Sequence, residues 1–307
     1  MSFAIADGET RAAVPALSRA IKDTLRAYVQ LTKPRIVLLF TLTGIAGLMA
    51  EGSLRGDPRR FWLVVLGILL TAGSANAFNQ YIDRDIDAIM ERTRKKRPLP
   101  LGLITPNHAF AYAVVTAIIA TVVLWVHGSP AAAFWGAFTI AFYVGVYTMW
   151  LKRTTPQNIV IGGAAGATAP LIGWAAGSGQ YLALIPFILF LIIFVWTPPH
   201  FWALALCIKD EYAGVDVPMM PVVAGEAATR RQIFGYSLGL VPLTLAPWAL
   251  GAQSAWYGVP AMLLGAEFLR RAWLVRQGTS ISECWKLFGY SIVYLLTLYL
   301  IMIGDKW

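Results

Sequence analysis

Long apolar runs separated by short polar connections fill almost the whole chain. A helix needs about 20 mostly apolar residues to cross a bilayer, and about nine runs reach that length. They lack the sustained alternation of barrel strands and are too long for such strands. The pattern therefore predicts an all-α, polytopic membrane protein with transmembrane helices near 36–53, 61–82, 108–127, 131–151, 157–177, 181–206, 232–251, 254–271 and 286–304.

One group of polar side chains recurs at a helical spacing at the end of the second apolar run. Asn79, Asp83 and Asp87 are four residues apart, so on an α-helix their side chains stack along one stripe. Oxygen-bearing side chains at the mouth of a membrane helix are costly unless a cation neutralises them. A hard divalent cation such as Mg²⁺ suits these ligands and normally carries phosphate oxygens as well. The stripe therefore predicts an enzyme with a magnesium–diphosphate site.

Composition agrees with a single membrane-embedded domain. Hydrophobic residues make up 58% of the 307 and charged residues 13%, with a mean hydropathy of +0.62. Because no linker or low-complexity tract interrupts the apolar runs, we expect one transmembrane domain over 31–307. Residues 1–30 are expected to form an N-terminal cytoplasmic extension that includes an interfacial amphipathic helix.

The basic residues predict the orientation in the membrane. Lys and Arg are concentrated before the first predicted helix and in the even-numbered loops, whereas the odd-numbered loops are nearly bare. The first loop is the exception, with Arg55, Arg59 and Arg60. By the positive-inside rule, the N-terminus and even loops are expected to be cytoplasmic and the C-terminus outside. The net charge of +9 is then a topology signal, so we expect contact with the lipid bilayer and no nucleic-acid partner.

A second acidic loop follows the sixth predicted helix, on the same side of the membrane. It contains Asp210, Glu211 and Asp216. Two acidic loops at corresponding places in two four-helix halves favour an internal pseudo-repeat around a central cavity. A second acidic cluster would let a second Mg²⁺ hold the diphosphate from the other side. Which of these acids binds metal is left open, and an ordinary solvated loop is the alternative.

Cations near both acidic segments are candidates for binding the diphosphate, arginine by bidentate hydrogen bonds. Lys95 and Lys96 are expected instead to anchor their loop to anionic headgroups. Asp85 points away from the stripe, Arg84 and Lys152 are candidate partners for it, and its role is left open. The candidate diphosphate-binding residues are Lys33, Arg35, Arg92, Arg97, Lys152, Arg153, Lys209 and Tyr212.

The sixth apolar run ends with an unusual string, Trp196-Thr-Pro-Pro-His200-Phe-Trp202. Two prolines interrupt the helical hydrogen bonds, which is tolerated where the segment lines a cavity. His200 is therefore a candidate for proton transfer or for contact with a large planar ligand, and a hydrogen-bonded packing residue is the alternative. In the fifth run, Gly162, Gly163 and Gly166 are expected to allow close helix packing.

The Asn-x3-Asp-x3-Asp motif, with the second acidic loop four helices later, resembles the intramembrane aromatic prenyltransferase (UbiA-type) superfamily. Further strings resemble its protohaem IX farnesyltransferase (haem O synthase) branch, from about Leu31 to the last helix. One departure is Glu211, where that branch has Asp before the tyrosine. The matching strings begin at Leu31 (LTKPRI), Asp83 (DRDID), Met90 (MERT), Asn158 (NIVIGG), Thr197 (TPPHFW) and Val217 (VPMMPV).

This resemblance implies transfer of a farnesyl group from farnesyl diphosphate to a vinyl group of haem b, with water addition, to give haem O. It implies Mg²⁺ as cofactor, the bacterial inner membrane as location and a downstream haem A synthase as partner. An aromatic acid or chlorin acceptor is one alternative, and a membrane transporter with acidic gates is another. The implied catalytic residues are Asn79, Asp83, Asp87, Asp210, Glu211 and His200, all but His200 as metal ligands.

Overall fold

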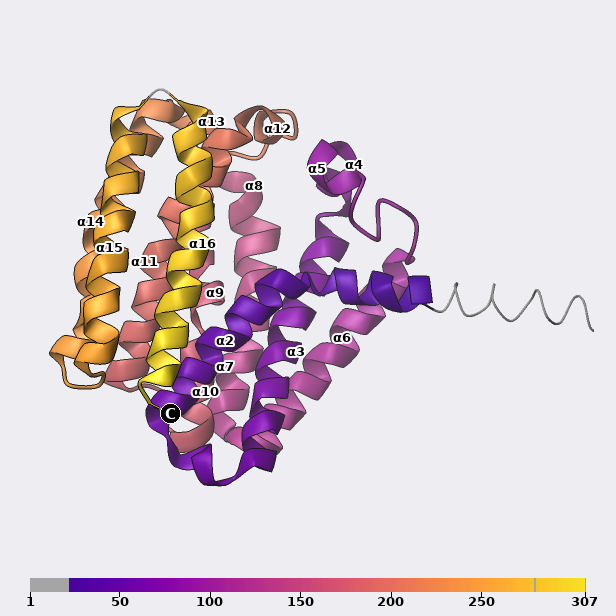
Figure 1. The fold of residues 1–307 in the computed structure, drawn as a ribbon. Helices are drawn as coiled ribbons and strands as arrows, with labels where there is room; N and C mark the ends of the chain where they lie inside the picture. Colours follow the sequence, from indigo (N-terminus) through magenta and orange to yellow (C-terminus); the bar gives the residue numbers. More distant parts are fainter. Residues whose placement is uncertain (1–21, 279, 307) are drawn as a thin grey trace, which may run out of the picture.

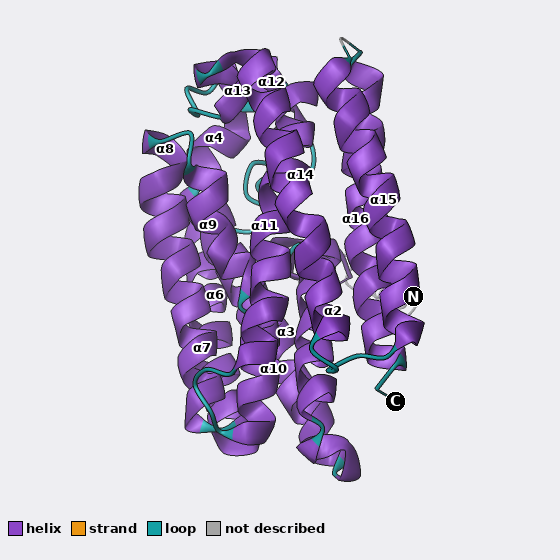
Figure 2. Cartoon of the chain, turned by 90° about the vertical axis from the view of Figure 1, so that its left-hand side faces the viewer, coloured by secondary structure: helices purple, strands orange, loops and turns teal. Residues whose placement is uncertain are grey.

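The computed structural model describes residues 22–278 and 280–306, and this part of the chain consists of helices and loops without strands. The long helices run side by side and form one bundle (Figure 1, Figure 2). They are α2 (Pro34–Glu51), α3 (Pro58–Ile82), α6 (Pro106–Val123) continued by η2 (Leu124–Gly128), α7 (Pro130–Ala141) continued by η3 (Phe142–Leu151) and α8 (Lys152–Thr154), α9 (Asn158–Ala167), α10 (Ala169–Ser178), α11 (Leu184–Cys207), α14 (Gly225–Ala249), α15 (Ala255–Gln277) and α16 (Ile281–Gly304). Short helices in the connections are η1 (Ser53–Gly56), α4 (Arg84–Ile89), α5 (Glu91–Arg94), α12 (Lys209–Ala213) and α13 (Met220–Val223).

The helices confirm the prediction of an all-α, multi-pass membrane protein. Among the described residues, seven helical segments are long and apolar enough to cross a membrane. Helices α14 and α15 have 25 and 23 residues and pack against those segments, but they carry charges such as Arg230 and Glu267 within their length. The predicted count of nine spans and the division into two pseudo-repeat halves therefore stay predictions.

Helix starts follow local sequence signals. Proline occupies the first turn of α2, α3, α6 and α7, where its missing N–H has no intrahelical partner to lose. Three of these helices also have side-chain caps, because Asp57, Thr105 and Ser129 each accept a backbone N–H three residues later. Rigid starts of this kind fix where each helix enters the bundle.

The fifth predicted span is two helices instead of one. Helices α9 and α10 meet at Thr168, and Pro170 lies in the first turn of α10. A proline there lacks the N–H that would continue the helix from α9, which explains the break. The Thr168 hydroxyl lies 2.6 Å from the Thr139 hydroxyl of α7, so the break is tied to a neighbouring helix.

A helix over 22–31 lies crosswise to the bundle before the chain turns into α2 (Figure 1). Ala27 and Leu31 are buried against a cluster that includes Ala77 of α3 and Ala109 of α6. The described part of the predicted extension is thus helical, as expected, whereas residues 1–21 lie outside the described part of the chain. Lys33 has a left-handed backbone (φ 55°), which turns the chain just before Pro34.

The two acidic connections lie at the same end of the bundle, as predicted: α4 and α5 lie near α12 and α13, opposite the C-terminus (Figure 1). Arginines of the first loop lie at the other end and bind helix-terminal carbonyls. Arg55 donates to the carbonyl of Met49 (2.6 Å), and Arg60 donates to those of His127 (2.6 Å) and Gly128 (3.0 Å). Such caps satisfy carbonyls left free at helix C-termini, so these two arginines have a structural role.

Candidate active site

The structure keeps Asn79, Asp83 and Asp87 on one stripe, although two helices carry them. Helix α3 ends at Ile82 and α4 begins at Arg84, yet the Asp83 N–H bonds the Asn79 carbonyl (2.9 Å) and the Asp87 N–H bonds the Asp83 carbonyl (2.8 Å). These are helical bonds, so the four-residue spacing is maintained through the break. The three residues are only 3%, 0% and 2% exposed, respectively. Two carboxylates are therefore buried together and need compensation.

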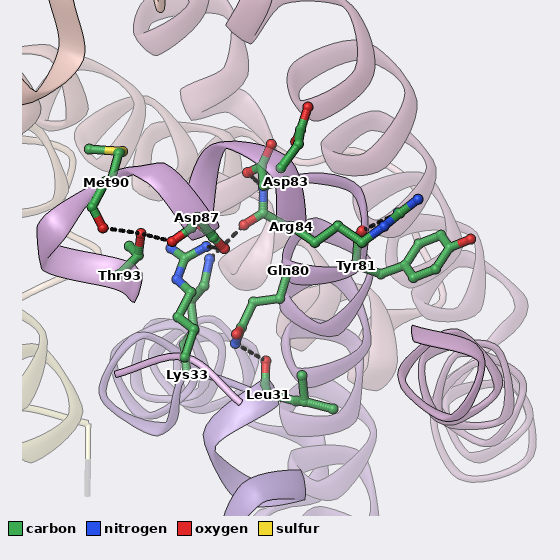
Figure 3. Close-up of polar contacts among 12 residues, drawn as sticks. Leu31, Lys33, Gln80, Tyr81, Asp83, Arg84, Asp87, Met90 and Thr93 are labelled. Atoms are coloured by element: carbon green, nitrogen blue, oxygen red, sulfur yellow. Dashed lines mark hydrogen bonds and ion pairs between the residues drawn. The ribbon is translucent and has the colours of Figure 1, made fainter. Parts of the chain in front are cut away.

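Three cations from separate parts of the chain compensate them. Lys33 donates from its Nζ to Asn79 Oδ1 (2.7 Å), Lys152 pairs with Asp83, and Arg97 pairs with Asp87. In Figure 3, Lys33 extends from the turn before α2 toward the segment that carries Asp87. Three basic side chains therefore surround two carboxylates. Burial, together with the neighbouring Arg97 and Lys152, lowers the pKa of Lys33, and a bound anion would favour its charged form. The arrangement favours an anionic ligand.

The position of Lys33 depends on Gln80, which the sequence reasoning did not single out. Its Nε2 donates to the carbonyls of Gln30 (3.0 Å) and Leu31 (2.9 Å), as Figure 3 shows for Leu31. Gln80 is 1% exposed, so these bonds form in a protected environment. They fasten the crosswise helix to α3, next to the stripe, and so bring Lys33 within reach of Asn79.

Thr148 is a second site residue that the sequence reasoning missed. It belongs to η3, a π-helix of 10 residues, and its hydroxyl donates to the Tyr143 carbonyl five residues earlier (2.8 Å). The same hydroxyl accepts from Asn79 Nδ2 (3.2 Å), which also donates to Asp83 Oδ2 (2.7 Å). A carboxylate only accepts, so this network fixes the amide orientation and turns Asn79 Oδ1 toward Lys33. π-Helical segments are rare and often occur at functional sites.

The buried stripe fits Mg²⁺ held jointly with a diphosphate. Within the described residues, Asp83 Oδ1 is buried without a hydrogen-bond partner, and Arg153 Nη2 lies 3.9 Å from it. No group of three Asp, Glu, His or Cys side chains is arranged as a complete metal cage in 22–278 and 280–306. Mg²⁺ is usually bound by one or two carboxylates plus substrate phosphates, so an incomplete cage with hard oxygen donors is suitable.

Asp85 corrects one expectation. It pairs with neither Arg84 nor Lys152, but receives two hydrogen bonds of 2.8 Å from Arg153. This contact lowers the pKa of Asp85 to about 2. Arg84 instead donates to the Tyr81 carbonyl (2.7 Å), and Lys152 is already paired with Asp83. The expectation failed because Lys152 is bound by Asp83, while the Arg153 guanidinium lies 2.8 Å from Asp85 and 3.9 Å from Asp83.

The second acidic loop lies at the same end but is not joined to the stripe by any hydrogen bond or ion pair among the described residues. Asp210 is exposed, and Glu211 accepts the backbone N–H of Arg92 (3.4 Å), a contact between the two loops. Lys209 pairs with Glu226 (3.5 Å). Burial raises the pKa of Tyr212, so its phenol stays neutral and can donate a hydrogen bond.

The candidate diphosphate ligands therefore fall into two groups. Lys33, Arg97, Lys152 and Arg153 converge on the stripe. Arg35 is exposed and has no hydrogen bond or ion pair within the described residues. Arg92 lies beside Glu211 and Tyr212 of the second loop, whereas Lys209 pairs with Glu226 of α14.

His200 lies in a different environment, in α11 beside α16. Its ring stacks between Trp196 (centroids 4.3 Å apart) and Phe288 (4.8 Å), and its Nδ1 lies 2.7 Å from Ser291 Oγ. Helix α11 remains continuous through Pro198 and Pro199, although neither proline has an N–H to bond the carbonyl four residues earlier. These contacts suit the packing alternative, while Nε2 has no hydrogen-bond partner in the described part of the chain. The catalytic role of His200 stays a prediction.

A membrane-spanning helical bundle with two buried carboxylates and several basic side chains at one end is typical of a polytopic membrane enzyme for an anionic substrate. Residues 37–300 match the model of the UbiA prenyltransferase family, and the chain belongs to that family.

Two curated relatives illustrate the closeness of the match. The chain is 48% identical over 281 residues to Protoheme IX farnesyltransferase of Thermosynechococcus vestitus, covering 91% of this chain and 88% of the relative. It is 46% identical over 292 residues to Protoheme IX farnesyltransferase 2 of Mesorhizobium japonicum, covering 94% and 92%. The resemblance inferred from the sequence motifs is thus confirmed.

Solved structures share the fold at lower sequence identity. A digeranylgeranylglyceryl phosphate synthase structure has a TM-score of 0.76 at 19% identity and covers 92% of this chain and 98% of its own. A UbiA homologue from Archaeoglobus fulgidus, bound to DMAPP and Mg²⁺, has a TM-score of 0.65 at 16% identity and covers 90% and 99%. These likenesses establish the fold.

Proposed function

We propose that this chain transfers the farnesyl group of farnesyl diphosphate to a vinyl group of haem b and adds water, giving haem O. The evidence for diphosphate binding is the buried stripe of Asn79, Asp83 and Asp87 with Lys33, Arg97 and Lys152 bound to it. The relatives named Protoheme IX farnesyltransferase, which align with more than nine-tenths of the chain, support haem as the acceptor. A family homologue bound to DMAPP and Mg²⁺ supports the metal and the leaving group.

In this proposal, Asn79, Asp83 and Asp87 hold Mg²⁺ while Lys33 and Arg97 bind the diphosphate. In the structure, Lys33 binds Asn79 and Arg97 binds Asp87. The phosphate oxygens would replace these side chains as hydrogen-bond acceptors for Lys33 and Arg97. Mg²⁺ supplies further positive charge that stabilises the departing diphosphate.

Lys152 and Arg153 lie beside Asp83 and add cationic groups that stabilise the same departing charge. Cleavage of the carbon–oxygen bond leaves an allylic farnesyl cation, which the haem vinyl group attacks. Water then adds to the resulting carbocation and loses one proton to the released diphosphate, which leaves the hydroxyl group on the product.

The remaining candidates have narrower proposed roles. Asp210 and Glu211 are proposed to bind a second Mg²⁺, with Arg92, Lys209 and Tyr212 around them as diphosphate contacts. The hydrogen bond between Glu211 and Arg92 supports this because it joins the two loops at one end of the bundle. His200 is proposed to contact haem through its unbonded Nε2, and the product is proposed to pass to a haem A synthase.

We also propose that the N-terminus and the end bearing α4 and α12 face the cytoplasm of a bacterial inner membrane. The concentration of Lys and Arg in the even-numbered loops supports this orientation. The arginines of the first loop are an exception to the positive-inside rule. Arg55 and Arg60 have another role there, because they donate hydrogen bonds to helix-terminal carbonyls.

A product assay tests the acceptor. Purified protein is incubated with labelled farnesyl diphosphate, Mg²⁺ and one acceptor at a time: haem b, an aromatic acid or a chlorin. The proposal expects label on haem b, with a mass increase of one farnesyl group plus one hydroxyl group. Label on another acceptor but not on haem b would be consistent with the diphosphate site and would show that haem b is not the acceptor. Solute flux in vesicles without any prenyl transfer would support a transporter instead.

A further inference from the structure

A basic pocket lies at the edge of the bundle, away from the stripe. It has a volume of about 440 Å³ and lies where α14 begins and α15 ends, at the same end as α12 and α13 (Figure 1). Its volume falls within the usual range of small-molecule sites, about 300–1,000 Å³. The pocket is lined by Glu226, Ala227, Arg230, Arg231, Arg276, Gln277 and Gly278.

Two of the three arginines that line the pocket are available to bind an anionic ligand. Arg230 is buried and occupied: it donates to the carbonyls of Val275 (3.1 Å) and Gly278 (2.8 Å) and pairs with Glu226 (3.4 Å). Arg231 and Arg276 are exposed, and neither has an ion-pair partner within the described residues. The Glu226 carboxylate is shared with Arg230 and Lys209, so it does not neutralise this pair.

The aromatic neighbours of Arg276 place the pocket at the membrane surface. Its guanidinium lies over the rings of Phe234 (5.0 Å to the centroid) and Trp273 (5.2 Å). The two rings contact each other at 5.3 Å, and Trp273 is 42% exposed on the outside of the bundle. Exposed Trp near the end of a membrane helix is typical of the headgroup level, and an arginine held over aromatic rings there is presented to that layer.

We propose that this pocket binds the phosphate headgroup of an anionic phospholipid. Arg231 and Arg276 contact the phosphate, Arg230 holds the end of α15 in place, and the Phe234–Trp273 pair packs against the upper acyl chain. Basic pockets between membrane helices on the cytoplasmic side bind anionic headgroups in this way. Its position on the outer surface of α14 and α15 favours a lipid, which diffuses in the bilayer, over a free phosphate ion.

Lipid binding to the full-length chain in detergent tests the proposal. Native mass spectrometry is used to count short-chain phosphatidylglycerol retained by the protein, against phosphatidylcholine and against inorganic phosphate. The test variant R231Q/R276Q removes the two unpaired cations and leaves the Arg230 cap intact. The control R270Q/K286Q removes the same charge nearby, from residues that are already paired with Glu267 and Glu283.

We expect wild type and R270Q/K286Q to retain phosphatidylglycerol in preference to phosphatidylcholine. R231Q/R276Q should bind phosphatidylglycerol about 25-fold more weakly, because each arginine near an anionic lipid contributes about fivefold. R231K/R276K keeps the charges and should retain most of the binding, which separates loss of charge from misfolding. Equal phosphatidylglycerol binding by the two Gln double variants would overturn the proposal, as would displacement of the lipid by millimolar inorganic phosphate.

Discussion

At the scale of residues, the amide of Asn79 does what a third carboxylate in the stripe could not do. Its amide accepts from Lys33 and donates to both Asp83 and Thr148. An aspartate at this position would place a third negative charge beside Asp83 and would lack the N–H groups that Asn79 donates to Asp83 and Thr148. The amide therefore links a cation to a buried carboxylate and still offers an oxygen as a metal ligand.

Replacing Thr148 tests this network. Thr148→Val keeps the shape but removes the acceptor of one Asn79 N–H, so Asn79 is held less firmly. A hydrogen bond of this kind contributes about 0.5–1.5 kcal/mol, which corresponds to a rise of about 2- to 12-fold in the KM for farnesyl diphosphate. Steady-state kinetics with each substrate varied in turn provide the measurement.

The matched control is Thr148→Ser, which retains the hydroxyl group and should behave like wild type. The KM for haem should not change in either variant, because His200 and the haem-directed string lie on α11. A Thr148→Val enzyme with wild-type kinetics would show that Thr148 does not position Asn79.

Sequence spacing could reveal part of this site and not the rest. Asn79, Asp83 and Asp87 show a four-residue period, which is visible in one segment. Thr148 and Gln80 gained their roles through contacts with residues 69 and about 50 positions away in the chain. No local pattern encodes such contacts, and the pairing of Asp85 with Arg153 was missed for the same reason.

At the scale of elements, close backbone contact between α2 and α10 holds the first helix in place. A Cβ added at Gly173 would lie 2.0 Å from the Gly44 carbonyl oxygen and 2.8 Å from the Leu48 nitrogen. The sequence reasoning expected close packing at the glycines of α9 instead. Gly162 and Gly163 do lie against Tyr147 and Thr197, but nothing lies within 4 Å of a Cβ at Gly166. That last expectation was wrong because Gly166 is exposed.

Glycine-to-alanine replacements distinguish these positions. Gly173→Ala forces the α2 and α10 backbones apart and should lower the free energy of unfolding by about 1–3 kcal/mol. Gly166→Ala is the control, with open space around it, and should be neutral or stabilising by up to about 1 kcal/mol because alanine favours the helix. Thermal unfolding in one detergent compares the two variants. Equal midpoints would contradict the packing account.

At the scale of the whole molecule, hydrophobic patterning predicted the architecture better than it predicted irregularities. Every predicted apolar run corresponds to a long helical region, since about 20 apolar residues leave few alternatives in a membrane. The break at Thr168 and the π-helix η3 were not predicted. Both lie inside apolar runs, where hydropathy is insensitive to a change in hydrogen bonding.

Reporter fusions test the proposed orientation. Alkaline phosphatase joined after α16 should be active, because the enzyme needs disulfides that form outside the cytoplasm. The same reporter joined after Gly102, in the connection between α5 and α6, should be inactive. The reverse pattern would place the stripe on the outer face and would contradict the positive-inside assignment.

The most direct test of the central claim is the Mg²⁺ dependence of farnesylated haem formation by Asp83→Asn. Its control, Glu91→Gln, makes the same chemical change at an exposed acid in the same connection, whose ion-pair partner in the described part of the chain is Lys95. Wild type and Glu91→Gln should form product with the same Mg²⁺ requirement. Asp83→Asn should be slower by about 100-fold or more, since even outer-shell changes at metal sites cost about 10- to 100-fold. Full product formation by Asp83→Asn at the wild-type Mg²⁺ concentration would show that the stripe is not the diphosphate site.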